Sequence, residues 1–142
     1  QEQRMLDISN IKALNNQEMT IGGHTFNHPI LSMENYKVAK TEIEQNLLGL
    51  SKIIDKEIFE FAYPNGKPNK DFNSDHVEIL ADAGVKLAVT TSPGFFEAGS
   101  DPLQIPRVSL TGNNTLSFIK SVIANYNCRG DIVECRGYEK TN

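Results

Sequence analysis

The sequence predicts an α/β fold built on a parallel sheet, either open or closed into a barrel. Apolar runs of strand length alternate along the chain with amphipathic stretches of helical period. Turns rich in Gly, Pro and Asn separate them. Alternation of this kind indicates helical crossovers between parallel strands. The 142 residues are enough for one domain with a hydrophobic core.

The first part of the chain predicts a short helix, a buried strand and a long helix. Residues 7–15 have helical spacing, and residues 19–21 have the character of a short buried strand that ends at Gly22 and Gly23. Ser32 is the expected N-cap of the long helix. That helix carries a core-facing stripe at spacings of three and four, formed by Tyr36, Ala39, Ile43, Leu47, Leu50 and Ile54.

A second helix is expected between two further strands. The strands are predicted at 58–63 and 85–91. Ser74 is the expected N-cap of the helix between them, and Gly84 is the expected C′ residue. The helix should turn three residues toward the core, namely Val77, Leu80 and Ala81.

The remaining sequence predicts a loop, an extended segment and a closing helix. The loop at 92–102 is rich in Gly and Pro, and residues 105–110 are expected to be extended. The helix is predicted over 115–126, and its apolar positions are Leu116, Ile119 and Ile123.

Composition and charge exclude several classes of function. The net charge is −4 with an isoelectric point near 5.4, and no basic stripe argues for nucleic-acid binding. No apolar run approaches the ~20 residues that a membrane span requires. The first residues lack the apolar stretch of a signal peptide, so we expect no export leader within this chain.

The two cysteines, Cys128 and Cys135, lie near the C-terminus with six residues between them. A disulfide closing this small loop and two free thiols are equally consistent with the spacing. A zinc site is less favoured, because no other Cys or His lies nearby in the sequence.

The feature with the clearest chemical content is the segment His24-Thr25-Phe26-Asn27-His28-Pro29. Histidines four residues apart can point the same way, and neutral imidazole is a good ligand for zinc and related metals. Two histidines do not complete a catalytic metal site, which needs a third protein ligand and an open position. The origin of that third ligand is the main question that the sequence raises.

Three unusual loops follow predicted strands, at 24–29, 63–66 and 91–95. Sites in parallel sheets collect at the carboxyl ends of the strands, so we expect these loops to converge on one face. In the third loop, Phe95 and Phe96 are suited equally to stacking on a sugar ring and to anchoring the loop.

Together these features resemble the polysaccharide deacetylases of carbohydrate esterase family 4, the NodB homology domain. The segment 24–29 matches the family's His-Ser/Thr-x-x-His-Pro motif throughout. Phe61-Ala62-Tyr63-Pro64-Asn65-Gly66, Ala83-Gly84-Val85 and Ile105-Pro106-Arg107-Val108 resemble later segments of the family in the same order. The resemblance runs from about Ile8 to Tyr126.

The resemblance implies part of a distorted (β/α) barrel that removes acetyl groups from an acetylated polysaccharide with a divalent metal, often zinc. His24 and His28 would be metal ligands. The backbone after Tyr63, in the segment Tyr63-Pro64-Asn65-Gly66, would bind substrate and donate to the oxyanion. The family's metal lowers the pKa of a bound water while an aspartate acts as base. Substrates of such enzymes imply a secreted or cell-envelope location.

The chain also departs from the family pattern. The family's first motif, Thr-Phe-Asp-Asp, supplies a metal ligand and the general base, but this chain has no Asp-Asp dipeptide. Arg107 could replace the absent motif-three arginine. We therefore expect residues 1–126 to be the C-terminal portion of a deacetylase domain and 127–142 to be a tail. A missing N-terminal segment or self-association would complete the fold. The alternative is a non-catalytic glycan-binding module.

Several other polar residues are assigned to ordinary structure. His76 is expected to be a surface residue of its helix. Glu42 and Glu44 are expected to belong to the solvated face of the long helix.

Overall fold

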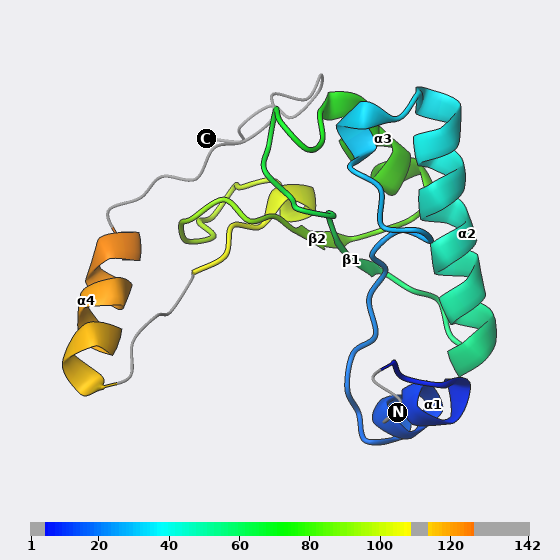
Figure 1. The fold of residues 1–142 in the computed structure, drawn as a ribbon, viewed down its shortest axis with the longest axis horizontal. Coiled ribbons are helices and arrows are strands. Elements are labelled where there is room, and N and C mark those ends of the chain that lie inside the picture. The colour runs from blue at the N-terminus through cyan, green and yellow to red at the C-terminus, as the bar shows by residue number, and fades with distance from the viewer. Residues whose placement is uncertain (1–4, 109–113, 127–142) are drawn as a thin grey trace.

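The computed structural model describes residues 5–108 and 114–126. Three helical elements come first, and one helix then separates the two strands (Figure 1). In chain order they are α1 (Ile8–Asn16), the 3₁₀ helix η1 (Leu31–Met33), α2 (Tyr36–Ile54), β1 (Glu60–Ala62), α3 (Ser74–Asp82), β2 (Leu87–Val89), the 3₁₀ helix η2 (Pro102–Gln104) and α4 (Thr115–Tyr126).

The sheet is parallel, as the alternation predicts. β1 pairs with β2, and Phe61 lies opposite Ala88. Isolated parallel bridges add one chain segment on each side, from Gly23 to Phe61 and from Val89 to Ile105. Four segments therefore run side by side in the order in which they occur in the sequence, and their carboxyl ends lie at one edge.

The first of these segments corrects the prediction of a buried strand at 19–21. Met19 is 53% exposed, and Gly23 is the residue that pairs with β1. The N–H of Gly23 donates to Glu60 O at 2.8 Å, and the N–H of Ala62 donates to Gly23 O at 2.8 Å. The paired residue is set by tertiary contact and not by apolar character. Gly23 has no side chain, so its backbone can approach β1 closely.

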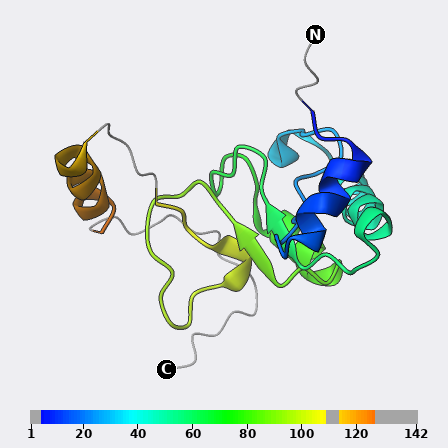
Figure 2. The same cartoon turned by 90° about the horizontal axis from the view of Figure 1, so that it is seen from below.

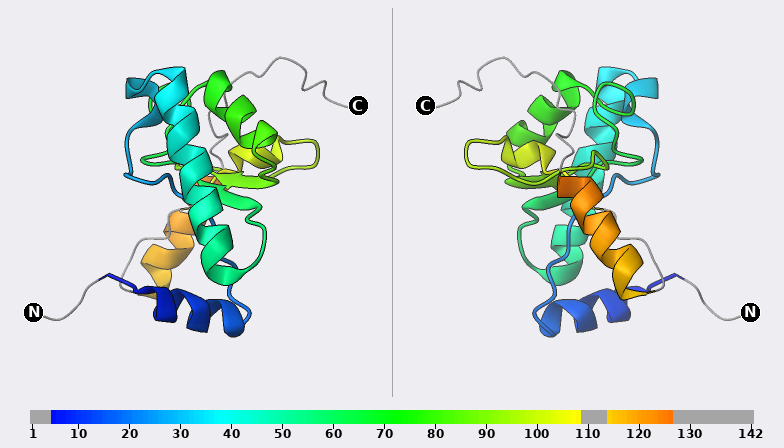
Figure 3. Two further views of the ribbon diagram at one scale, coloured as in Figure 1. Left: turned by 90° about the vertical axis from the view of Figure 1, so that its right-hand side faces the viewer. Right: turned by 90° about the vertical axis from the view of Figure 1, so that its left-hand side faces the viewer.

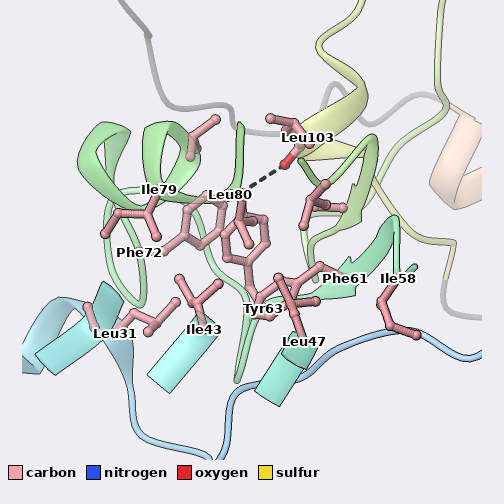
Figure 4. Packing of buried hydrophobic residues seen from close by; sticks show 14 of the residues in the cluster. Leu31, Ile43, Leu47, Ile58, Phe61, Tyr63, Phe72, Ile79, Leu80 and Leu103 are labelled. Atoms are coloured by element: carbon pink, nitrogen blue, oxygen red, sulfur yellow. Dashed lines mark hydrogen bonds between the residues drawn. The ribbon is translucent and has the colours of Figure 1, made fainter. Parts of the chain in front are cut away.

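Helices α2 and α3 pack together over one face of the sheet, and α1 packs against α2 (Figure 3). The core lies between the sheet and α2 and α3 (Figure 4). Tyr63 and Phe72 stack there with ring centroids 3.7 Å apart, and the Tyr63 hydroxyl donates to Leu103 O at 3.0 Å. The fully buried side chains around them include Leu31, Ile43, Ile79 and Leu80.

The long helix begins later than predicted. Asn35 is its N-cap, with Oδ1 accepting from the N–H of Val38 at 3.0 Å. Ser32 instead lies in η1, and its hydroxyl donates to Lys70 O at 2.6 Å. Within the predicted stripe, Tyr36 is half-exposed because it occupies the first turn, beyond the core.

The second helix also has a different cap. Asn73 rather than Ser74 caps α3, because the Asn73 side chain accepts from the N–H of Asp75 at 3.1 Å. Ala81 is exposed and not turned toward the core as predicted. Gly84 has φ +83°, which confirms it as the residue that ends the helix in the left-handed conformation.

Helices α1 and α4 contribute little to the core. α1 buries no residue, although the half-buried Ile11 packs against the cluster and Asn15 accepts a hydrogen bond from Lys56 Nζ at 3.1 Å. Figure 2 shows α4 apart from α2 and α3. The predicted helix is confirmed, and its apolar positions Leu116, Ile119 and Ile123 are exposed.

Within the described residues, no helix combines the length and apolar character needed to span a membrane. Cys128 and Cys135 lie outside them.

His76 is not the surface residue that the sequence suggested, because its side chain is only 4% exposed. Its Nδ1 accepts from the N–H of Asn73 at 3.0 Å, so the ring completes the cap of α3. Burial lowers the pKa of His76 below its ordinary value, against the opposing effects of a hydrogen bond to the Leu31 backbone and the charge of Asp75. The folded protein therefore favours the neutral ring.

This burial makes stability depend on pH. Below the ordinary histidine pKa the unfolded chain binds a proton that folded His76 resists, so the free energy of unfolding should fall as the pH is lowered from about 7.5 to about 5.5. We expect the fall to be smaller in His76→Gln than in the wild type. Urea unfolding of both proteins across this range measures the difference, and parallel pH profiles would contradict the prediction.

Candidate active site

His24 and His28 lie just beyond the carboxyl end of the first sheet segment. Their ring centroids are 4.7 Å apart with an interplanar angle of 72°, and both side chains are exposed. His24 Nδ1 lies 2.7 Å from Ala62 O, the last residue of β1. Because the carbonyl can only accept, Nδ1 carries the proton, and in the neutral ring Nε2 keeps its lone pair. Metal-binding histidines are commonly oriented by a backbone carbonyl in this way.

The loop that carries the two histidines has an unusual backbone. Thr25 has φ +62° and His28 has φ +58°, although neither residue is glycine. Such conformations cost on the order of 1–3 kcal/mol each and persist only where surrounding contacts impose them. One contact is local, since the buried Thr25 donates its hydroxyl proton to His24 O at 2.6 Å.

The other contacts come from α2. Asn46 Oδ1 accepts from the N–H of His24 at 2.9 Å. Glu42 accepts from the backbone N–H groups of Phe26 and Asn27 and from the Asn27 side chain, at 3.0, 2.7 and 2.7 Å. Desolvation acts to raise the pKa of Glu42, but these hydrogen bonds outweigh it and hold the pKa below its ordinary value.

Glu42 and Asn46 both contact the histidine loop, and the sequence did not predict either contact. Glu42 was expected on a solvated helix face, and it is instead half-buried against the histidine loop. The available signal was that a Glu and an Asn four residues apart share one side of a helix. Nothing in the local sequence, however, indicates which loop they meet.

The segment 63–66 forms the neighbouring loop. Asn65 has φ +56° and Gly66 has φ +74°. Thr91, which follows β2, anchors both residues: its hydroxyl donates to Asn65 O at 2.6 Å, and its N–H donates to Gly66 O at 2.8 Å. The Gly66 N–H donates to Pro64 O at 2.6 Å. Among the residues that the structure describes, none accepts from the N–H of Asn65.

The Tyr63 side chain lies in the core, below the backbone that the sequence assigned to the site. Its ring is 1% exposed and packs in the core, and its N–H donates to Val89 O at 3.2 Å. The side chain therefore supports the loop from below and presents no surface to a substrate. Pro64 is also buried, so Asn65 is the exposed residue of this segment.

Arg107 lies at the far side of the same edge. Its N–H donates to Ser92 O at 2.9 Å, and its Nε donates to Thr90 O. The three predicted loops thus meet at the carboxyl edge of the sheet, linked by hydrogen bonds from His24 to Ala62 and from Thr91 to Asn65.

The two histidines suit a divalent metal but form only part of a site. Their side chains are exposed, close together and, for His24, oriented through Nδ1. Within residues 5–108 and 114–126, no group of three His, Cys, Asp or Glu side chains could hold a metal ion. Two imidazole donors are compatible with half of a tetrahedral zinc site.

Comparison with known proteins identifies the family. The family model described as polysaccharide deacetylase matches residues 7–88, more than half of the chain. The chain belongs to the polysaccharide deacetylase family. No curated protein matches this family member significantly.

Solved deacetylase structures share its fold. The Streptococcus pyogenes deacetylase PplD, solved with acetate, is 29% identical with a TM-score of 0.66, covering 72% of this chain and 43% of that one. The Bacillus cereus polysaccharide deacetylase BC0361 is 26% identical with a TM-score of 0.68, and the match covers 82% of this chain and 36% of that one. The BpsB deacetylase domain of Bordetella bronchiseptica is 13% identical with a TM-score of 0.64. The match covers 72% of this chain and 48% of that one, and it shows the fold alone.

These matches confirm the predicted fold class, a portion of the distorted (β/α) barrel of polysaccharide deacetylases. This family member spans less than half the length of each of the three proteins.

The close approach at Gly23 generates a stability prediction. A Cβ there would lie 2.8 Å from Leu47 Cδ2, 2.9 Å from Asn46 Oδ1 and 3.0 Å from the Phe61 ring. We expect Gly23→Ala to lower the free energy of unfolding by about 1–3 kcal/mol, measured by urea denaturation.

Gly49→Ala on α2 is the matched control. A Cβ at Gly49 meets nothing within 4 Å, so replacing a helical glycine there should raise stability by about 0.5–1 kcal/mol. A stability gain or no change in Gly23→Ala would contradict the packing account.

Proposed function

We propose that the chain is part of a metal-dependent deacetylase that removes acetyl groups from an acetylated polysaccharide. The observation that carries the proposal is the His24–His28 pair, with His24 Nδ1 directed to Ala62 O, in a member of the deacetylase family. The acetate bound to the 29% identical PplD supports an acetyl group as the unit released. A polysaccharide substrate supports action outside the cell or in its envelope.

His24 and His28 would hold the metal through their imidazole nitrogens. A bound divalent metal, with zinc as our first candidate, supplies Lewis-acid chemistry that polarises a carbonyl and acidifies water. The described residues contain no third ligand beside the pair. We therefore assign the third ligand and the general base to a segment or partner beyond the described residues, where the family places its Asp-Asp motif.

The N–H of Asn65 is the group that we assign to the oxyanion. No described residue accepts from this N–H, and Thr91 fixes the carbonyls of Asn65 and Gly66 that follow it. A preorganised N–H at a developing oxyanion stabilises the transition state without reorganisation. Arg107 at the same edge is the candidate cation beside the base, with its Nε held by Thr90 O.

A second candidate function, glycan binding without catalysis, is supported by the lack of a third metal ligand among the described residues. A non-catalytic glycan-binding module would need the fold and the exposed edge but neither a third ligand nor a base. Sugar binding that survives both a chelator and His24→Ala would support this alternative, whereas chelator-sensitive acetate release would support the deacetylase.

The histidine pair should bind metal measurably. We expect Zn²⁺ binding that is lost in the double variant His24→Ala/His28→Ala and retained in His76→Gln, whose histidine is buried in α3. Binding should also weaken at acid pH, because a protonated imidazole cannot ligate. Competition with a chromophoric chelator measures the affinity, and equal affinity in the wild type and the double variant would contradict the assignment.

The oxyanion assignment predicts a contrast between neighbouring residues. Asn65→Gly keeps the backbone donor and suits φ +56°, so acetate release by the completed domain should be retained. Gly66→Ala places a Cβ 3.0 Å from Tyr63 O and 3.1 Å from Thr91 N at φ +74°, so it should lower kcat by roughly 10²–10³-fold if the donor is displaced. Loss of activity in Asn65→Gly would indicate a side-chain role instead.

A further inference from the structure

The histidine loop has conformations that its own sequence does not favour. Thr25 and His28 both lie in the left-handed region, and Thr25 is β-branched. The rings nevertheless meet edge to face at 4.7 Å. Contacts from elsewhere in the fold must therefore select this backbone over the extended alternatives.

A single carboxylate provides most of those contacts. Glu42 Oε2 accepts from the N–H groups of Phe26 and Asn27, and Oε1 accepts from Asn27 Nδ2. The only salt bridge among the described residues joins Lys40 to Glu44, so no cation neutralises Glu42 there. Its charge is instead stabilised by three N–H donors of the histidine loop, which makes each of these hydrogen bonds charge-assisted.

The next turn of α2 holds the other end of the loop. Asn46 lies four residues after Glu42, and its Oδ1 accepts from the N–H of His24 at 2.9 Å. The absence of a side chain at Gly23 allows this approach, because a Cβ there would lie 2.9 Å from Asn46 Oδ1. One face of α2 therefore holds both ends of the loop, the His24 end through Asn46 and the Asn27 end through Glu42.

We propose that Glu42 and Asn46 are positioning residues that hold the His24–His28 pair in the geometry needed to bind metal. The part of this proposal that concerns metal binding rests on the proposed function. Glu42 is not itself the missing third ligand, because both of its oxygens are engaged by the loop. It acts through the backbone, as an outer-shell group that orients a ligand.

The test compares three variants of α2 with the wild type in the whole chain. Glu42→Ala removes both acceptor oxygens and with them all three hydrogen bonds. Glu42→Gln keeps an oxygen for the two backbone donors, and the Asn27 amide can turn to accept from the new NH₂ group. Glu44→Ala is the matched control, because Glu44 lies on the same helix and its carboxylate forms an exposed ion pair with Lys40.

Two readouts separate the positioning of the pair from general folding. The ring ¹⁵N shifts of His24 report whether Nδ1 keeps the proton that it shares with Ala62 O. The Zn²⁺ affinity reports the pair as a ligand set. In Glu42→Ala we expect faster hydrogen exchange of the Phe26 and Asn27 amides, a mixture of His24 tautomers and a roughly 10–100-fold weaker Zn²⁺ affinity.

We expect Glu42→Gln to lie close to the wild type and Glu44→Ala to match it in every readout. A His24 tautomer and Zn²⁺ affinity in Glu42→Ala that equal those of the wild type would overturn the proposal, even if the amides exchange faster. Should the wild type bind no Zn²⁺, the proposed metal function fails, and an unchanged His24 tautomer in Glu42→Ala would still overturn the positioning role.

Discussion

The backbone pairing of Gly23 with β1 is the contact on which the candidate site depends. Two hydrogen bonds of 2.8 Å, to Glu60 O and from Ala62 N, bring the first segment against the sheet. His24 then emerges beside the carboxyl end of β1, where its Nδ1 reaches Ala62 O. No other residue fits at Gly23 without displacing neighbours, because Leu47, Asn46 and Phe61 leave no room for a Cβ.

Helix α2 connects the core to the site. Ala39, Ile43 and Leu47 face the sheet and are buried, so the helix is held firmly by apolar packing. Glu42 and Asn46 project from the same helix toward the histidine loop. A site supported by a packed helix is more precisely held than one supported by loops alone. The geometry of the exposed His24 and His28 rings thus depends on the buried residues that hold α2 in place.

The same edge of the sheet collects groups of different kinds. The imidazole pair follows the first segment, the Asn65 N–H follows β1, and Arg107 follows Ile105. Their convergence is the behaviour expected of parallel sheets, whose sites gather at the carboxyl ends of the strands. The proposed deacetylation would take place at this edge, and the two deacetylases most alike in sequence among those described are more than twice as long as the portion that this chain covers.

The sequence by itself determined the order of elements, the parallel sheet and the His24-x-x-x-His28 motif, because periodicity and motif spacing are local properties. It predicted the helices closely, yet it placed the first sheet segment at 19–21, chose Ser32 and Ser74 as caps and left His76 on the surface. Only the tertiary structure decided these points: Gly23 pairs, Asn35 and Asn73 cap, and His76 is buried. It also turned Tyr63 into the core and Glu42 onto the histidine loop. The physical reason is that these hydrogen bonds join residues far apart in the sequence, 15 residues for Asn27 and Glu42 and 40 for Tyr63 and Leu103. Which residues meet depends on how the helices pack on the sheet, and local sequence patterns do not determine that packing.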